Sequence, residues 1–275
     1  MQPSTLAKCT FEGSCRPVEN VQRRQRYRLH APSGRACRAL LPQSSYKIDQ
    51  RLPTMTQGEF SKAAPRYIAI EGPIGVGKTT LTKRLADSFN YELLLEKSEE
   101  NPFLDRFYQN PKQHALSTQL FFLFQRAQQI QDLRQNDMFE PVRVADFLID
   151  KDQLFAQQNL EPDEFELYLN VYRHLTIDAP APDLVIYLQA PTNVLLDRIQ
   201  KRAVESEQLI ELTYLQNLNE AYAEFFHYYD KSPLLIVNSE DIDLANNEDD
   251  YQQLLKRIAS ASAGTYYFNP RPSLI

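Results

Sequence analysis

Residues 67–80 read YIAIEGPIGVGKTT, and this stretch alone defines a phosphate-binding unit. Its first part, Tyr67–Glu71, has the apolar and β-branched character of a buried strand, and it runs directly into the pattern Gly-x-x-x-x-Gly-Lys-Thr. Glycines in such a loop let backbone N–H groups wrap a phosphate, and the helix that follows adds partial positive charge. Lys78 is expected to reach the β- and γ-phosphates, and Thr79 can hold Mg²⁺. The predicted site for ATP or GTP consists of Gly72, Pro73, Ile74, Gly75, Val76, Gly77, Lys78, Thr79 and Thr80.

Short strand-like runs alternate with helical patterns after this loop. Strands are expected at Tyr67–Glu71, Glu92–Glu96, Val142–Asp146, Asp183–Leu188 and Leu234–Val237. Helices are expected at Thr79–Phe89, His114–Gln135, Asp163–Leu175, Thr192–Arg202 and Ser206–Tyr229. The alternation predicts an α/β fold, a five-stranded parallel sheet flanked by helices. Ligands of such sheets bind beyond the carboxyl ends of the strands.

Charge and cysteine are unevenly distributed along the 275 residues, whose net charge is −6. Residues 1–54 carry ten Lys and Arg against three Asp and Glu, and they contain all three cysteines. The remaining residues are therefore acidic and free of cysteine. This argues against a nucleic-acid partner and excludes a disulfide framework, a cysteine zinc site and a cysteine nucleophile there. Because no run of about 18 apolar residues occurs, a membrane partner is not expected either, and we expect a cytoplasmic protein.

Residues 1–60 are predicted to be a disordered basic extension, and residues 61–275 to form the P-loop domain. The first segment lacks helical or strand periodicity and is rich in Arg, Ser, Pro and Gln. An organellar transit peptide, a basic interaction arm and upstream sequence translated from too early a start codon would each explain it. We favour the last, with Met55 as the alternative start, because it precedes the first strand by about a dozen residues.

Two carboxylates close neighbouring predicted strands. Glu96 ends the second strand and Asp146 ends the third. P-loop enzymes hold Mg²⁺ or orient a nucleophile with acids at such positions, and two acids allow both tasks. The alternative for Glu96 is that it belongs to the solvated charged run that continues to Glu100.

The predicted helix His114–Gln135 places two polar residues within its apolar stripe. Gln119 and Arg126 lie seven residues apart and so project from the same face, among Leu116, Leu120, Leu123, Ala127 and Ile130. An unpaired amide or guanidinium there would cost several kcal/mol, so both side chains must meet partners. They either pair within the protein or line a pocket for a planar polar ligand such as a nucleobase.

Arg198 and Arg202 lie one helical turn apart at the end of a predicted helix. Facing the triphosphate, they would form a lid that stabilises charge on the transferring phosphoryl group. A solvated basic face, extended by Lys201, is the alternative.

Together these residues resemble the deoxynucleoside kinases of the thymidylate-kinase-like P-loop group, especially the branch found in proteobacteria. The resemblance covers about residues 66 to 257. It rests on the motifs EGPIGVGKTT at 71–80, NPFL at 101–104 with FY at 107–108, Gln119 with Arg126, PDLVIYL at 182–188, Arg198-Ile199 with Lys201-Arg202, and Tyr214-Leu215 with Leu218 and Tyr222.

The resemblance implies a role for each matched residue. Glu96 matches the glutamate that takes the proton from the nucleoside 5′-hydroxyl. Tyr108 and Glu207 match the pair that binds the sugar 3′-hydroxyl. Gln119 and Arg126 match the base-reading pair, and Arg198 and Arg202 match lid arginines over the phosphates. Asp146 with Thr79 is the expected Mg²⁺ site.

The chain also departs from the family pattern. Where the family has Asp/Glu-Arg-Ser after the third strand, this sequence has Ala145-Asp146-Phe147. Without a gap, Ala145 replaces the acid and Asp146 the arginine, whereas a shift of one residue leaves the acid at Asp146. The arginine is missing in both alignments. Val204 replaces a further lid arginine, and Lys97 replaces the proline after the catalytic glutamate. Lys151 stands where an aspartate usually supports the base-reading arginine.

The sequence thus predicts ATP·Mg²⁺-dependent phosphorylation of the 5′-hydroxyl of a deoxynucleoside, in a homodimer by family analogy. A nucleoside monophosphate kinase and a catalytically silent nucleotide-binding module are the alternatives. Arg126 is the only cation among the residues assigned to the acceptor pocket, which favours an acceptor without a phosphate. The preferred base, and whether ATP or GTP is the donor, stay open.

Overall fold

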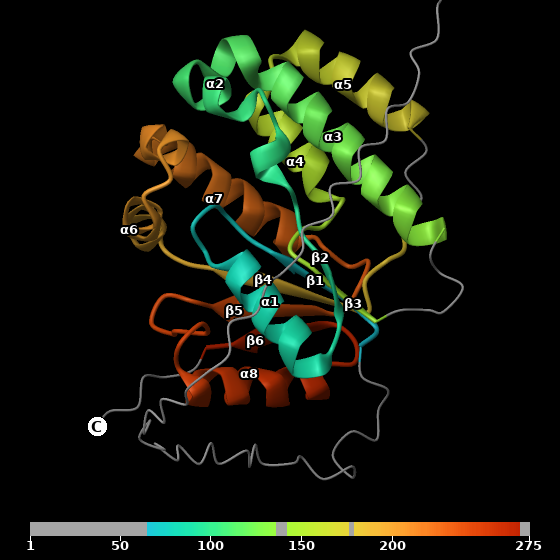
Figure 1. Ribbon diagram of the computed structural model, residues 1–275, viewed down its shortest axis with the longest axis vertical. Coiled ribbons are helices and arrows are strands. Elements are labelled where there is room, and N and C mark those ends of the chain that lie inside the picture. The colour runs from blue at the N-terminus through green and yellow to red at the C-terminus, as the bar shows by residue number, and fades with distance from the viewer. Residues whose placement is uncertain (1–64, 136–141, 176–178, 270–275) are drawn as a thin grey trace, which may run out of the picture. The chain divides into compact units, whose positions relative to one another are not determined.

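The computed structural model describes residues 65–135, 142–175 and 179–269 (Figure 1). The expectations for residues 1–60 and for Met55 lie outside these ranges. Among the helices in these ranges, none combines the length and apolar character that a membrane crossing requires.

A parallel sheet forms the centre of the described fold (Figure 1). Its strand order is β2-β3-β1-β4-β5-β6. The strands are β1 Tyr67–Glu71, β2 Glu92–Leu94, β3 Arg143–Ala145, β4 Leu184–Gln189, β5 Leu234–Asn238 and β6 Thr265–Phe268. Five of them confirm predicted strands, with ends that shift by up to two residues.

The prediction of five strands is nevertheless wrong, because β6 adds a sixth at the edge. It pairs in parallel with β5, from Leu234 opposite Thr265 to Val237 opposite Phe268. Side chains along β6 alternate between exposed and half-buried, as they do on an edge strand that covers the core on one side. The fully apolar run that marks the central strands is therefore absent from its sequence.

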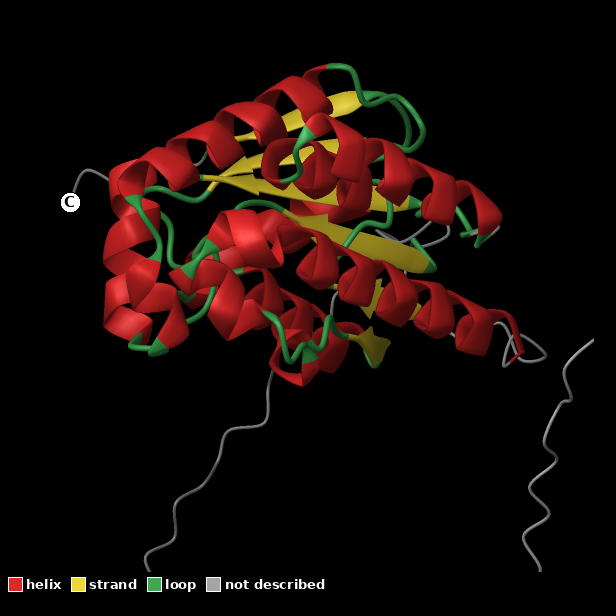
Figure 2. Ribbon diagram, turned by 90° about the horizontal axis from the view of Figure 1, so that it is seen from above, coloured by secondary structure: helices red, strands yellow, loops and turns green. Residues whose placement is uncertain are grey.

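Helices cover both faces of the sheet (Figure 2). On one face α1 Lys78–Phe89 and α8 Glu248–Ser260 pack against Ile68, Ile70 and Ile186. On the other face α4 Lys151–Asn159 and α7 Leu212–His227 pack against Val185 and Tyr187. The remaining helices are α2 Leu104–Gln109, α3 Pro111–Gln135, α5 Pro162–His174 and α6 Thr192–Arg202, and short 3-10 turns occur at Ser98–Glu100 and Ser206–Leu209.

One predicted helix is broken in the structure. Ser206–Tyr229 is not continuous, because Ile210 and Glu211 adopt extended backbone between the 3-10 turn and α7. Ile210 is buried there, so its packing outweighs the helical pattern on either side of it. The helices α2, α4 and α8 were not predicted.

The alternation of side chains along β1 places a carboxylate at the end of the strand. Ile68 and Ile70 point to the face covered by α1 and α8, whereas Ala69 points to the opposite face. The Glu71 side chain points to the same face as Ala69, where its carboxylate accepts a hydrogen bond from the Tyr222 hydroxyl of α7. The strand therefore delivers a buried carboxylate directly beneath the loop that begins at Gly72.

Candidate active site

The loop after β1 has the backbone of a phosphate-binding loop. Gly72 and Gly75 have φ angles of 151° and 82°, and a Cβ at either position would lie within 2.3 or 2.8 Å of a backbone carbonyl oxygen. Glycine is therefore required at both. Lys78 Nζ donates to the carbonyls of Gly72 and Pro73 at 2.6 and 3.2 Å, so the ammonium lies across the loop. Burial lowers the pKa of Lys78, against nearby carboxylates led by Glu71.

Asp146 connects the loop to the end of β2. Thr79 Oγ1 donates to Asp146 Oδ2 at 2.6 Å, and the backbone N–H of Glu96 donates to Asp146 Oδ1 at 2.7 Å. Burial raises the pKa of Asp146, whereas these two hydrogen bonds favour its ionised form. Three segments far apart in the sequence are thereby held together where the parallel strands end.

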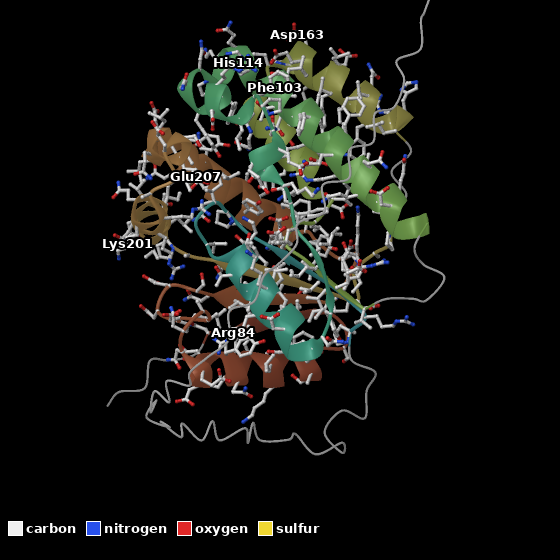
Figure 3. All side chains as sticks on the ribbon, viewed as in Figure 1. Arg84, Phe103, His114, Asp163, Lys201 and Glu207 are labelled. Carbon is white, nitrogen blue, oxygen red and sulfur yellow. The ribbon has the colours of Figure 1, made fainter. Side chains whose placement is uncertain are left out.

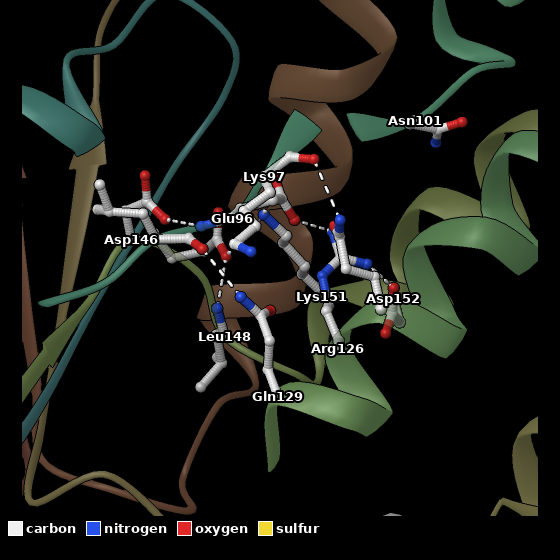
Figure 4. Close-up of polar contacts among 12 residues, drawn as sticks. Glu96, Lys97, Asn101, Arg126, Gln129, Asp146, Leu148, Lys151 and Asp152 are labelled. Atoms are coloured by element: carbon white, nitrogen blue, oxygen red, sulfur yellow. Dashed lines mark hydrogen bonds and ion pairs between the residues drawn. The ribbon is translucent and has the colours of Figure 1, made fainter. Parts of the chain in front are cut away.

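Glu96 lies in a cluster of cations (Figure 4). Arg126 forms ion pairs with both Glu96 and Asp152, and Lys151 Nζ lies 3.3 Å from Glu96 Oε2. Burial opposes ionisation of Glu96, but Arg126, Lys151 and Lys78 outweigh it and lower its pKa to about 2. Glu96 is therefore a carboxylate at neutral pH and can accept a proton or a hydrogen bond. The alternative of a solvated charged run does not fit, because only 18% of its side chain is exposed.

A cavity of about 200 Å³ lies between this cluster and the phosphate-binding loop. It brings together most of the predicted site residues from six segments of the chain. Its lining includes Lys78, Thr79, Glu96, Tyr108, Gln119, Arg126, Asp146, Arg202 and Glu207, together with Lys151, Phe122, Phe155 and Tyr214. Gln119 and Arg126 are 3% and 4% exposed, which places both in the buried stripe of α3 as predicted.

The cavity lining also includes a phenol, a carboxylate and a guanidinium. Tyr108 and Glu207 both line it, and Arg202 forms an ion pair with Glu207. Burial, with Tyr214 and Glu207 nearby, raises the pKa of Tyr108 well above its usual value, so its hydroxyl is a neutral hydrogen-bond donor. Figure 3 labels Glu207 on the segment that leads into α7 and Lys201 on the outer side of α6.

Arg198 is separated from Arg202 in the structure. Its guanidinium donates to the carbonyl of Ser239 at 2.7 Å and lines a different groove, of about 580 Å³. That groove borders the other side of the phosphate-binding loop at Gly77 and Thr80 and is closed by residues 239–246.

The structure also assigns partners that sequence reasoning missed. Asp152, rather than the residue at 151, supports Arg126, so the expectation that a lysine replaces this aspartate is wrong by one position. Lys151 instead faces Glu96 and Glu71. Sequence reasoning missed these contacts because it did not predict α4, whose first two residues are Lys151 and Asp152. Without that helix, the directions of the two side chains could not be assigned.

The donor atoms present fit Mg²⁺. A hydroxyl from Thr79 and a carboxylate from Asp146 are hard oxygen ligands, and Mg²⁺ is commonly held by one or two protein groups with substrate phosphates and water. Within the described ranges no cluster of three or more His, Cys, Asp or Glu side chains could hold a metal ion by itself. The site therefore suits an ion that arrives with a nucleotide.

The strand order, the loop and the cavity define a P-loop kinase that acts on a small acceptor. Residues 68–262 match the deoxynucleoside kinase family, and the chain belongs to it. It is accordingly a deoxynucleoside kinase that phosphorylates deoxynucleosides with ATP. It is 36% identical over 200 residues to a deoxyguanosine kinase of Bacillus subtilis, an alignment that spans 70% of this chain and 95% of that protein. It is 29% identical over 203 residues to the deoxyadenosine/deoxycytidine kinase of the same organism, spanning 70% and 91%.

Solved structures agree with this assignment. Deoxyadenosine kinase from M. mycoides with bound dCTP superimposes with a TM-score of 0.60 at 26% identity. The match covers 70% of this chain and 99% of that one.

Proposed function

We propose that the 200 Å³ cavity binds the deoxynucleoside and that Glu96 accepts the proton of its 5′-hydroxyl. The supporting observation is the place of Glu96, whose carboxylate lines the same cavity as Lys78 and Thr79 of the phosphate-binding loop. A hydroxyl held there lies between a proton acceptor and the γ-phosphoryl group. Transfer then forms the 5′-oxygen–phosphorus bond, breaks the bond between the γ-phosphorus and the bridging oxygen, and leaves ADP.

The sugar and the base are proposed to bind deeper in the cavity. Tyr108 and Glu207 offer a donor and an acceptor for a 3′-hydroxyl. Gln119 and Arg126 face a base, with Phe122 and Phe155 as apolar walls. Arg126 Nε is buried and makes no hydrogen bond within the described part of the chain, which leaves a donor for a ligand.

The triphosphate is proposed to bind on the loop side. Backbone N–H groups and Lys78 hold the phosphates, Arg202 adds positive charge over them, and the groove beside Arg198 takes the rest of the ATP molecule. Thr79 and Asp146 would hold Mg²⁺, which neutralises charge on the β- and γ-oxygens.

An acceptor without a phosphate fits the charges of the cavity, although the sequence argument for it needs correction. Arg126 is not the only cation near the acceptor, because Lys151 and Arg202 line the cavity too. Each is already paired with carboxylates: Lys151 with Glu71 and Glu96, Arg202 with Glu207. A phosphate on the acceptor would add negative charge beside the Glu96 and Glu207 carboxylates, whose charges these cations already balance, whereas a hydroxyl group adds none.

Deoxyguanosine is the proposed first substrate, because a deoxyguanosine kinase is the relative with 36% identity. The test is to incubate the purified protein with ATP, Mg²⁺ and each deoxynucleoside, with guanosine and dGMP as further acceptors, and to separate the products. We expect monophosphates from deoxynucleosides, with dGMP formed fastest. Diphosphate formed from added dGMP would contradict the proposed acceptor. A homodimer and a cytoplasmic location stay predictions.

A further inference from the structure

Lys151 occupies a position that is unfavourable for a cation unless something requires it there. It is the first residue of α4 and only 2% of it is exposed. The N-terminus of a helix carries partial positive charge, so a lysine in the first turn is repelled, and burial adds a desolvation cost. Its place must therefore be explained by what its ammonium group contacts.

Two carboxylates hold the ammonium group. Lys151 Nζ lies 3.5 Å from Glu71 Oε2 and 3.3 Å from Glu96 Oε2. Both carboxylates are within reach of one nitrogen because β1 and β2 run parallel, so the residues at and beyond their carboxyl ends lie on the same side of the sheet. Figure 4 shows Lys151 between the Glu96 side and the Arg126 side of this cluster.

The two carboxylates differ in what they can do. Glu71 is fully buried and its oxygens already accept from Gly72 N, Leu148 N and Tyr222 Oη, each at 2.9 Å. It is a fixed anchor with no access to substrate. Glu96, by contrast, is partly exposed to the cavity. Lys151 is thus held on one side by an immobile group and presents its remaining donors toward the proposed proton acceptor.

Arg126, the other partner of Glu96, has a competing task. It also pairs with Asp152, and it is the guanidinium proposed to meet the base. When Arg126 turns to a ligand, Lys151 is the cation that stays with Glu96. An ammonium group has three N–H donors, and two carboxylates leave one for the cavity.

We propose that Lys151 is a further catalytic residue for phosphoryl transfer, which orients the Glu96 carboxylate and directs its third N–H at the 5′-oxygen. The inference rests on the proposed role of Glu96. In this step the 5′-hydroxyl proton passes to Glu96. After transfer the same N–H faces an oxygen of the new 5′-phosphate. The chain thereby has a cation in the acceptor site although the arginine expected after β3 is absent.

The test compares Lys151→Met with Lys151→Arg and with the control Lys231→Met. Lys231 also pairs with a carboxylate, that of Asp150, but its side chain is 64% exposed. For Lys151→Met we expect kcat to fall about 10²-fold, as when a single charge donor to a transition state is removed. The KM for deoxynucleoside should change less than about threefold, because nucleoside binding does not need this group. Lys151→Arg should recover most of the lost kcat, and Lys231→Met should match the wild type.

A second readout separates a role in catalysis from a role in folding. Binding of the product monophosphate to Lys151→Met should weaken about tenfold relative to binding of the deoxynucleoside, since a hydrogen bond to a charged oxygen is lost. A folding role alone would weaken both equally. Should Lys151→Met fail to fold because Glu71 is left buried and unpaired, combining it with Glu71→Gln removes both charges, and the folded double variant should keep the low kcat.

The outcomes distinguish this inference from the proposed function. A wild-type protein that converts no deoxynucleoside to a monophosphate overturns both. An active wild type, together with a folded Lys151→Met or double variant whose kcat stays within about threefold of it, overturns the inference about Lys151 and leaves the function intact.

Discussion

At the scale of single residues, the surroundings of Glu96 set a limit on its strength as a base. A carboxyl group with a pKa of about 2 is ionised but holds a proton weakly. Arg126 is the first of the charged groups that lower this pKa. A nucleobase that engages Arg126 would therefore raise the pKa of Glu96 when the substrate is in place. Substrate binding and proton acceptance are coupled in this arrangement.

Replacing Glu96 with glutamine should separate catalysis from binding. Glu96→Gln keeps the size of the side chain but cannot take up a proton, so we expect kcat to fall about 10²-fold or more. Deoxynucleoside binding, measured by calorimetry, should persist. Glu100→Gln, in the exposed pair with Lys97, is the control and should be fully active. Unchanged turnover in Glu96→Gln would mean that another group accepts the proton.

The same carboxyl group should make stability depend on acidity. Its pKa falls from an ordinary 4.5 to about 2 on folding. A lowered carboxyl pKa stabilises the fold above the unfolded value, and that contribution is lost as pH falls from about 4.5 toward about 2. It amounts to about 3 kcal/mol at most.

Urea unfolding of wild type and Glu96→Gln between pH 7 and pH 3 measures this effect. The difference in free energy of unfolding should be largest near neutral pH and shrink with acidification, because glutamine does not titrate. The free energy of unfolding of Glu100→Gln should differ from that of the wild type by the same small amount at every pH in this range. A difference for Glu96→Gln that does not change with pH would contradict the lowered pKa.

At the scale of elements, the end of β3 determines how the loop and Glu96 are joined. Asp146 accepts hydrogen bonds from the Thr79 hydroxyl and from the backbone N–H of Glu96. One carboxylate therefore contacts both the second proposed Mg²⁺ ligand, Thr79, and the backbone of the proposed proton acceptor, Glu96. Asp146→Asn should weaken Mg²⁺ binding and lower turnover together, with about a tenfold higher Mg²⁺ concentration needed for half-maximal rate. Asp87→Asn, exposed on α1, is the control. A normal Mg²⁺ titration for Asp146→Asn would assign the carboxylate a purely structural task.

Several elements could be predicted from the sequence, although α8 was missed despite the helical spacing of its buried residues Tyr251, Leu254 and Ile258. β1 and α6 were predicted with their observed bounds, because an apolar run marks β1 and a break after Arg202 marks the end of α6. The placement of Gln119 and Arg126 on one buried face followed from their spacing alone. α4 and β6 were missed because α4 begins with buried charges and β6 lies at an edge. Lys151 and Asp152 could be assigned only after α4 was known, since their roles depend on direction rather than on spacing.

At the scale of the whole described fold, the cavity and the β6 edge lie in different regions. The cavity is lined by residues from Ile74 to Tyr214, around the ends of β1, β2 and β3. β6 lies at the opposite edge of the sheet, beyond β4 and β5. Tyr266 and Phe268 of β6 pack on the cluster formed with α1 and α8. A change at this edge should therefore lower the stability of the fold and leave substrate binding unchanged.

Ending the chain after Ser262 removes β6 and tests this separation. Two half-buried aromatic side chains are lost, which costs about 2 kcal/mol. For a domain of this size that lowers the melting temperature by roughly 4–8 °C. The uncovered edge of β5 should also increase aggregation, because unpaired N–H and C=O groups can pair with another chain. Ending the chain after Phe268 keeps β6 and serves as the control. The KM for deoxynucleoside at low temperature should match the wild type in both, since no lining residue is removed. A large rise in that KM after removal of β6 would show that the edge strand and the cavity are coupled through the sheet.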